Sequence, residues 1–154
     1  MNDQTTTLKR VLLTTDLSEA SERAFPVAAA IADAVGASIT VLHALDLEPQ
    51  LPPGALSLSP RAQEEFRQEV RALVQTRLTE LTGKYLSDVS HVDTDIIEGH
   101  GAAHLICDHA QDGGFDLIVI STHGRTALGR MLIGSTAEKV MRGAHCPVVS
   151  VPPK

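Results

Sequence analysis

The sequence is poor in aromatic residues and has fewer basic than acidic residues. It contains no tryptophan, one tyrosine and three phenylalanines, too few rings for the stacking platforms on which binders of single-stranded nucleic acid depend. Lysine and arginine number 13 against 19 aspartates and glutamates, so the formal net charge is -6. A field of that sign repels a polyanion, and we therefore expect no nucleic acid polymer among the partners.

Cysteine and long apolar runs are also scarce. Cys107 and Cys146 are the two cysteines and lack C-x-x-C spacing, which argues against a disulfide scaffold and a cysteine-rich zinc site. No hydrophobic stretch approaches the length of a membrane-spanning helix, and residues 1–9 contain no apolar core of a secretion signal. These features predict a cytoplasmic protein with two reduced, buried thiols and no membrane partner.

What the chain does contain is a regular alternation of two kinds of segment. Short runs rich in β-branched residues alternate with longer stretches whose apolar residues recur three and four positions apart, which is typical of βαβ units. The predicted strands cover residues 10–15, 38–44, a part of 89–97, 115–120 and 147–151. The predicted helices run from beyond Asp16 to Gly36, from Pro60, with Ser59 as its N-cap, to Gly83, from Ala102 to Gln111 and from Ser135 to Arg142.

The alternation predicts an α/β fold with an open, doubly wound, Rossmann-like sheet. We expect five parallel strands in the order 3-2-1-4-5, with helices on both faces, in a single domain that spans residues 1–154. The mixed polarity of the third strand places it at an edge of the sheet. Ligands of such sheets bind beyond the carboxyl ends of the strands where the winding direction reverses. Those ends are Thr15 with Asp16, and Ser121 with the residues that follow it.

The loop that begins at Ser121 has the composition of a phosphate site. Glycine lets backbone N–H groups approach an anion, and the start of the next helix adds unsatisfied donors and the positive end of its dipole. The glycines, hydroxyls and guanidinium groups of this segment are Gly124, Gly129, Gly134, Ser135, Thr136, Arg125 and Arg130. The loop is not a Walker A loop, because Gly-Lys-Ser/Thr is absent, and Gly-x-Gly-x-x-Gly does not follow the first strand.

The spacing in this loop resembles the nucleotide motif of the universal stress protein family, which is Gly, two residues, Gly, nine residues, Gly and then Ser or Thr. Gly124, Gly134 and Ser135 fall in register, and Ser121 stands where the motif has its first glycine. An extended Ser121 would cost little, whereas a required positive φ would cost more. The resemblance covers nearly the whole chain, through residues 11–18 and 41–44, Gly99, and Cys146 with the residues after it.

The resemblance implies a homodimer that binds ATP together with Mg²⁺ or Mn²⁺. Asp16, next to Thr15, would contact the ribose or the metal ion near the phosphates, and it is also placed to cap the helix that follows. The backbone of Ala44 would border the adenine. The residues expected at the phosphates are Gly124, Gly134, Ser135 and Thr136, with charge from Arg125 and Arg130.

Two function classes stay open: a nucleotide-dependent sensor or regulator in the stress response, and a dimeric interaction module that no longer binds nucleotide. Asp16 and His123 are the only loose candidates for a catalytic base or water-orienting group, so we expect slow or absent ATP hydrolysis. We expect His123 to orient its neighbours rather than to act as a catalytic base, because the sequence places no carboxylate to orient its ring. We expect His100 and His104, four residues apart, to be solvated rather than to share a metal.

The homodimer is expected to form through the last strand. That strand, from Pro147 to Val151, lies at the edge of the predicted sheet, and an exposed apolar edge is a liability unless something pairs with it. Two copies can pair antiparallel about a two-fold axis, which gives a closed interface.

Overall fold

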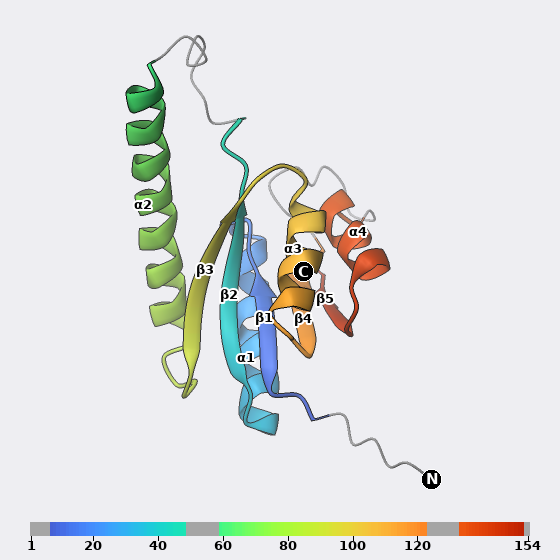
Figure 1. Ribbon diagram of the computed structural model, residues 1–154. Coiled ribbons are helices and arrows are strands. Elements are labelled where there is room, and N and C mark those ends of the chain that lie inside the picture. The colour runs from blue at the N-terminus through green and yellow to red at the C-terminus, as the bar shows by residue number, and fades with distance from the viewer. Residues whose placement is uncertain (1–6, 49–58, 123–132, 153–154) are drawn as a thin grey trace.

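The computed structural model describes residues 7–48, 59–122 and 133–152. The strands are β1 (Arg10–Thr14), β2 (Ser38–Leu45), β3 (Val92–Glu98), β4 (Leu117–Ser121) and β5 (Val148–Val151). They pair in parallel in the order β3-β2-β1-β4-β5 (Figure 1). The predicted strand order is confirmed, with β3 at one edge and β5 at the other.

Helices cover both faces of the sheet, as predicted. The helical elements are η1 (Ser21–Arg23), α1 (Ala24–Val35), α2 (Pro60–Tyr85), α3 (Ala102–Asp112) and α4 (Ser135–Gly143). Successive strand residues point to opposite faces, so Val11 and Leu13 pack in the cluster that contains the buried residues of α1 and α2. Leu12 packs in a second cluster with the buried residues of α3 and α4. The β-strands thus lie between two aliphatic layers.

The ends of the helices follow local sequence signals. Gly36 ends α1 in the left-handed conformation at φ 71°, which glycine adopts at little cost. Ser59 caps α2 by accepting a hydrogen bond from the N–H of Ala62. The prediction that α2 ends at Gly83 is short by two residues, because Tyr85 continues the helix and its ring lies 5.5 Å from that of Phe25.

The starts of three elements differ from the predictions for local reasons, and several other ends shift by a single residue. β4 starts at Leu117 rather than 115, because the carboxylate of Asp116 turns to accept hydrogen bonds from the N–H groups of Lys9 and Arg10. β5 starts at Val148, since Pro147 has no N–H to donate. The helix after Asp16 begins as the 3₁₀ turn η1 before α1.

A buried carboxylate joins η1 to the last turns of α2. Glu22 accepts hydrogen bonds from Arg77 at 2.7 Å, from Lys84 at 3.0 Å and from the Tyr85 hydroxyl at 2.7 Å. The Tyr85 hydrogen bond and the neighbouring cations hold the pKa of Glu22 below its ordinary value. Across the described ranges no helix, the 26-residue α2 included, is long and apolar enough to cross a membrane.

Candidate functional site

A cavity of about 260 Å³ lies at the carboxyl ends of β1, β2 and β4. Every predicted site residue that the structure describes lines it, namely Thr15, Asp16, Ala44, Ser121, Gly134, Ser135 and Thr136. The remaining predicted residues, His123, Gly124, Arg125 and Arg130, lie outside the described residues. The sheet therefore brings together side chains from four separate segments of the sequence.

The start of α4 forms one wall of this cavity. Its N-cap is Gly134, and Ser135, Thr136 and Ala137 follow along the wall. Gly134 has no side chain with which to cap the first turn, so the first backbone donors and the positive end of the helix dipole lie uncapped beside the cavity that these residues line. This wall is suited to an anion.

The start of α3 forms a second wall, which the sequence analysis did not predict. Ala102 and Ile106 line the cavity one helical turn apart, and the N-cap is again a glycine, Gly101, at φ 77°. The signal for this wall was Gly99 and Gly101 ahead of an apolar helix face, but nothing in the sequence placed it beside the loop after β4. Ile106 and Ile120 give the cavity an apolar side next to its polar end.

Gly134 lies very close to the end of β4. Its N–H donates to the carbonyl oxygen of Thr122 at 2.6 Å, and a Cβ at this position would lie 2.9 Å from the same oxygen. Its φ of −58° suits any residue, so the close approach, not the conformation, favours glycine here. The N–H of Thr122 donates in turn to Val151 at 2.9 Å, which links the start of α4 to β5.

Asp16 sits in a short turn directly after β1. Its Oδ1 accepts hydrogen bonds from the N–H of Ser18 at 3.0 Å and from the Ser18 hydroxyl at 2.5 Å. Between them, Leu17 has a φ of 65°, and no other non-glycine residue in the described part of the chain has a positive φ. The carboxylate therefore holds a local turn while it also lines the cavity. The prediction that it caps the following helix is wrong, because the N-caps of η1 and α1 are Ala20 and Arg23 and neither helix has a side-chain cap.

Ser121 occupies the position at which the motif has glycine. It is the last residue of β4 and pairs with Val151 in the parallel ladder. Its hydroxyl donates to the carbonyl oxygen of Ala20 at 3.2 Å. Of the two outcomes considered for this position, the structure has the extended conformation that any residue adopts without strain.

The cavity does not contain an activated nucleophile among its described residues. Cys107 and Cys146 pack beside the cluster under α3 and α4, and burial raises the pKa of both thiols. A thiol that stays protonated is a poor nucleophile. Asp16 is the carboxylate that lines the cavity, and with the hydroxyls of Ser135 and Thr136 it offers the oxygen ligands that Mg²⁺ prefers.

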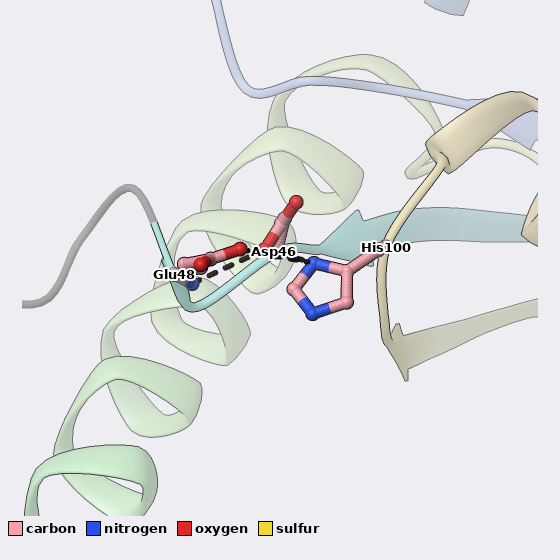
Figure 2. Close-up of side chains that lie close together, drawn as sticks. All are labelled: Asp46, Glu48 and His100. Carbon is pink, nitrogen blue, oxygen red and sulfur yellow. Dashed lines mark hydrogen bonds and ion pairs between the residues drawn. The ribbon is translucent and has the colours of Figure 1, made fainter. Parts of the chain in front are cut away.

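A second group of polar side chains lies at the carboxyl ends of β2 and β3 (Figure 2). His100 Nδ1 is 3.1 Å from Asp46 Oδ1 and 3.6 Å from Glu48 Oε2, and the three potential ligand atoms lie within 4.8 Å of one another. Their side chains are 73%, 39% and 75% exposed. All three side chains are open to water, and exposed acidic groups of this kind are common without a bound ion, so this group is a solvated polar cluster.

His104 does not join this group. It pairs with Asp108 at 3.2 Å on its own helix, and its side chain is 80% exposed. His100 and His104 therefore have separate carboxylate partners, and each is solvated as the sequence analysis expected. None of Asp46, Glu48 and His100 lines the cavity described above.

The comparisons with known proteins agree with this architecture. Residues 7–152 match the model of the universal stress protein family. The universal stress protein MJ0531 of Methanocaldococcus jannaschii is 33% identical over 146 residues, which is 93% of this chain and 81% of that protein.

Solved structures show the same fold. The structure of MJ0577 from Methanocaldococcus jannaschii superposes with a TM-score of 0.81 at 26% identity, over 96% of this chain and 98% of that one. A universal stress protein in complex with cAMP superposes with a TM-score of 0.70 at 20% identity, over 95% and 98% of the two chains. The family model spans nearly the entire described chain, and this protein belongs to the universal stress protein family.

Proposed function

We propose that this protein binds ATP with Mg²⁺ or Mn²⁺ in the cavity at the carboxyl ends of β1, β2 and β4, and acts as a homodimeric, nucleotide-dependent sensor or regulator in the stress response. The observation that carries the proposal is the convergence of two glycine-capped helix starts, those of α3 and α4, on one cavity. The universal stress protein that was solved with cAMP has the same fold, which supports an adenine nucleotide as the ligand.

The two ends of the cavity suit the two ends of a nucleotide. Backbone donors of α4 and the hydroxyls of Ser135 and Thr136 suit the phosphates. Ile106 and the backbone of Ala44 offer an apolar surface with peptide groups for the base. Asp16 is negative, so it favours a bound cation or a ribose hydroxyl over direct contact with a phosphate.

We further propose that ATP turnover is slow or absent. Fast phosphoryl transfer needs a group that orients or deprotonates the attacking water. Asp16 is the one carboxylate among the described lining residues, and its Oδ1 is already engaged by Ser18. The protein is thus better suited to report bound nucleotide than to consume it.

Thermal unfolding with and without nucleotide tests the binding proposal. A ligand that binds only the folded state stabilises it by about 2.7 kcal/mol at one hundred times Kd, so ATP with Mg²⁺ should raise Tm in a concentration-dependent way. Adenosine alone and inorganic tripolyphosphate alone should each raise Tm less, because each fills one end of the cavity. A Tm that ATP leaves unchanged, in a protein that is still a dimer by light scattering, would favour the interaction module instead.

The open edge of β5 supports the proposed homodimer. The carbonyl oxygen of Pro147 accepts a hydrogen bond from Ile118 of β4, and that of Val151 accepts one from Thr122, directly after β4. Backbone direction alternates along a parallel strand, so the peptide groups of Val148 and Ser150 face away from β4. Two copies can pair through these groups, and Pro152 ends the ladder because it has no donor.

A further inference from the structure

We infer that His43 is a positioning residue for the proposed ATP site, and that it holds the Asp16 turn in its binding conformation from the opposite face of the sheet. The expected effect of His43 on ATP affinity rests on the proposed function. The claim that His43 holds the Asp16 turn concerns the ligand-free protein and does not depend on ATP binding.

The turn it holds is a strained one. Leu17 follows Asp16 at φ 65°, a region in which the Cβ of an L-residue is crowded by the next carbonyl group. Residues in such conformations persist only where their surroundings over-determine them. Inside the turn, the Leu17 N–H donates to Thr15 Oγ1 at 3.0 Å, and Thr15 Oγ1 lies 2.8 Å from Ser21 Oγ.

β2 fixes both backbone groups of Thr15. The Thr15 N–H donates to the carbonyl oxygen of Leu42 at 3.0 Å. The Thr15 carbonyl oxygen lies 2.9 Å from Nδ1 of His43. Because a carbonyl oxygen only accepts, Nδ1 must carry the proton in this contact. Two consecutive residues of β2 therefore hold the peptide groups on each side of the Thr15 side chain.

His43 acts from outside the cavity. It is 6% exposed, and it does not line the cavity, whereas its neighbour Ala44 does. Side chains alternate along β2, so His43 shares the face of Val41 and Leu45, which pack with α1 and α2. Among the described contacts, the ring therefore reaches the cavity through the turn that it holds.

Three variants separate positioning from bulk stability. His43→Leu keeps a similar volume but removes the donor to Thr15, and His43→Asn keeps an amide donor near the position of Nδ1. Ile39→Val is the matched control, because it alters a fully buried side chain on the same face of β2 far from the turn. By calorimetry we expect ATP affinity to fall about tenfold or more in His43→Leu, to recover within about threefold in His43→Asn, and to be unchanged in Ile39→Val.

The ligand-free protein gives an independent readout. A long-range ¹⁵N–¹H spectrum should show His43 with its proton on Nδ1, and the amides of Leu17 and Ser18 should exchange with solvent faster in His43→Leu than in Ile39→Val. A proton on Nε2, or equal amide exchange in the two variants, overturns the inference. If wild-type protein does not bind ATP but these two results hold, the proposed function fails and the role of His43 in the turn stands.

Discussion

Replacing Gly134 with alanine is the most direct test of the cavity. The new Cβ would lie 2.9 Å from the carbonyl oxygen of Thr122, and contact becomes ordinary only at 3.4 Å. The start of α4 must therefore move by about 0.5 Å away from β4, because the opposing atom is backbone and cannot rotate aside. The movement also lengthens the 2.6 Å hydrogen bond from Gly134 to Thr122.

The magnitude of the effect follows from these two contacts. Overpacking of this size costs about 1–3 kcal/mol, which lowers Tm by about 2–12 °C for a chain of this length. The displaced backbone donors at the start of α4 would weaken their hydrogen bonds to the phosphate. A hydrogen bond to a charged group contributes about 1.5–3 kcal/mol, and we take this as the size of the loss in binding free energy. We therefore expect ATP affinity to fall by about one to two orders of magnitude.

Calorimetry with ATP and a thermal melt of Gly134→Ala measure the two effects. Gly83→Ala is the matched control, since Gly83 lies inside α2 and a Cβ there meets nothing within 4 Å. The control should gain up to about 1 kcal/mol from helix propensity and bind ATP normally. Unchanged affinity and unchanged Tm in Gly134→Ala would show that the start of α4 does not form the phosphate wall.

Three further predictions concern the buried carboxylate, the sheet edge and the cation. Glu22→Gln should lower the free energy of unfolding by about 1–3 kcal/mol at pH 7. The pKa of Glu22 is held below its ordinary 4.5, first by Tyr85 and then by Lys84 and Arg77. Its stabilisation is therefore full above pH 4.5 and is lost as pH falls through the lowered value. In urea unfolding, the difference in unfolding free energy between wild type and Glu22→Gln should be smaller at pH 3 than at pH 7, and equal differences at the two pH values would refute this. Ser150→Pro blocks the outward edge of β5 and should yield a monomer by light scattering, whereas a variant that stays dimeric would move the interface elsewhere. Asp16→Asn keeps the Oδ1 acceptor for Ser18 but should reduce the gain in ATP affinity that Mg²⁺ gives, while His100→Ala should leave that gain intact; the reverse pattern in calorimetry would place the cation at the group in Figure 2.

The strand order was predictable because the sequence alternates strand and helix patterns without interruption. The apolar run that forms β4 is typical of a central strand, and the polar residues of β3 indicate an edge; the strand order confirms both predictions. The exact ends of elements were not predictable. Tyr85 extends α2 through contacts with Phe25 and Glu22, and those partners lie about sixty residues away in the sequence.

Of the two walls of the cavity, the sequence predicts one and not the other. The α4 wall was predictable because its residues follow a recognisable glycine spacing directly after β4. The α3 wall was not, because Ala102 and Ile106 reach the cavity only once the sheet is assembled. The contact of His43 with Thr15 was likewise hidden, since 28 residues separate them and the histidine reads as one member of an apolar strand.

The edge of β5 shows how register refines a sequence argument. Proline at Val149, in the middle of β5, is the first substitution to consider for breaking a dimer ladder, because proline removes a donor. Pro147 and Val151 direct their carbonyl groups toward β4, however, and the period of two gives Val149 the same direction. Proline there would disrupt the monomer's own sheet, so the substitution that tests the dimer belongs at Ser150.

Ser121 decides how the departure from the glycine motif should be interpreted. In the motif this position has no side chain, and a glycine here would leave the Ala20 carbonyl oxygen without the hydroxyl that now donates to it. Ala20 belongs to the same stretch, residues 15–21, that carries Asp16 and that His43 contacts through Thr15. This stretch is therefore held from β2 on one side and from β4 on the other. Because Ser121 is extended and paired in β4, the hydroxyl adds this attachment without backbone strain. The substitution changes how the site is held in place, and it gives no physical reason for the site to be lost.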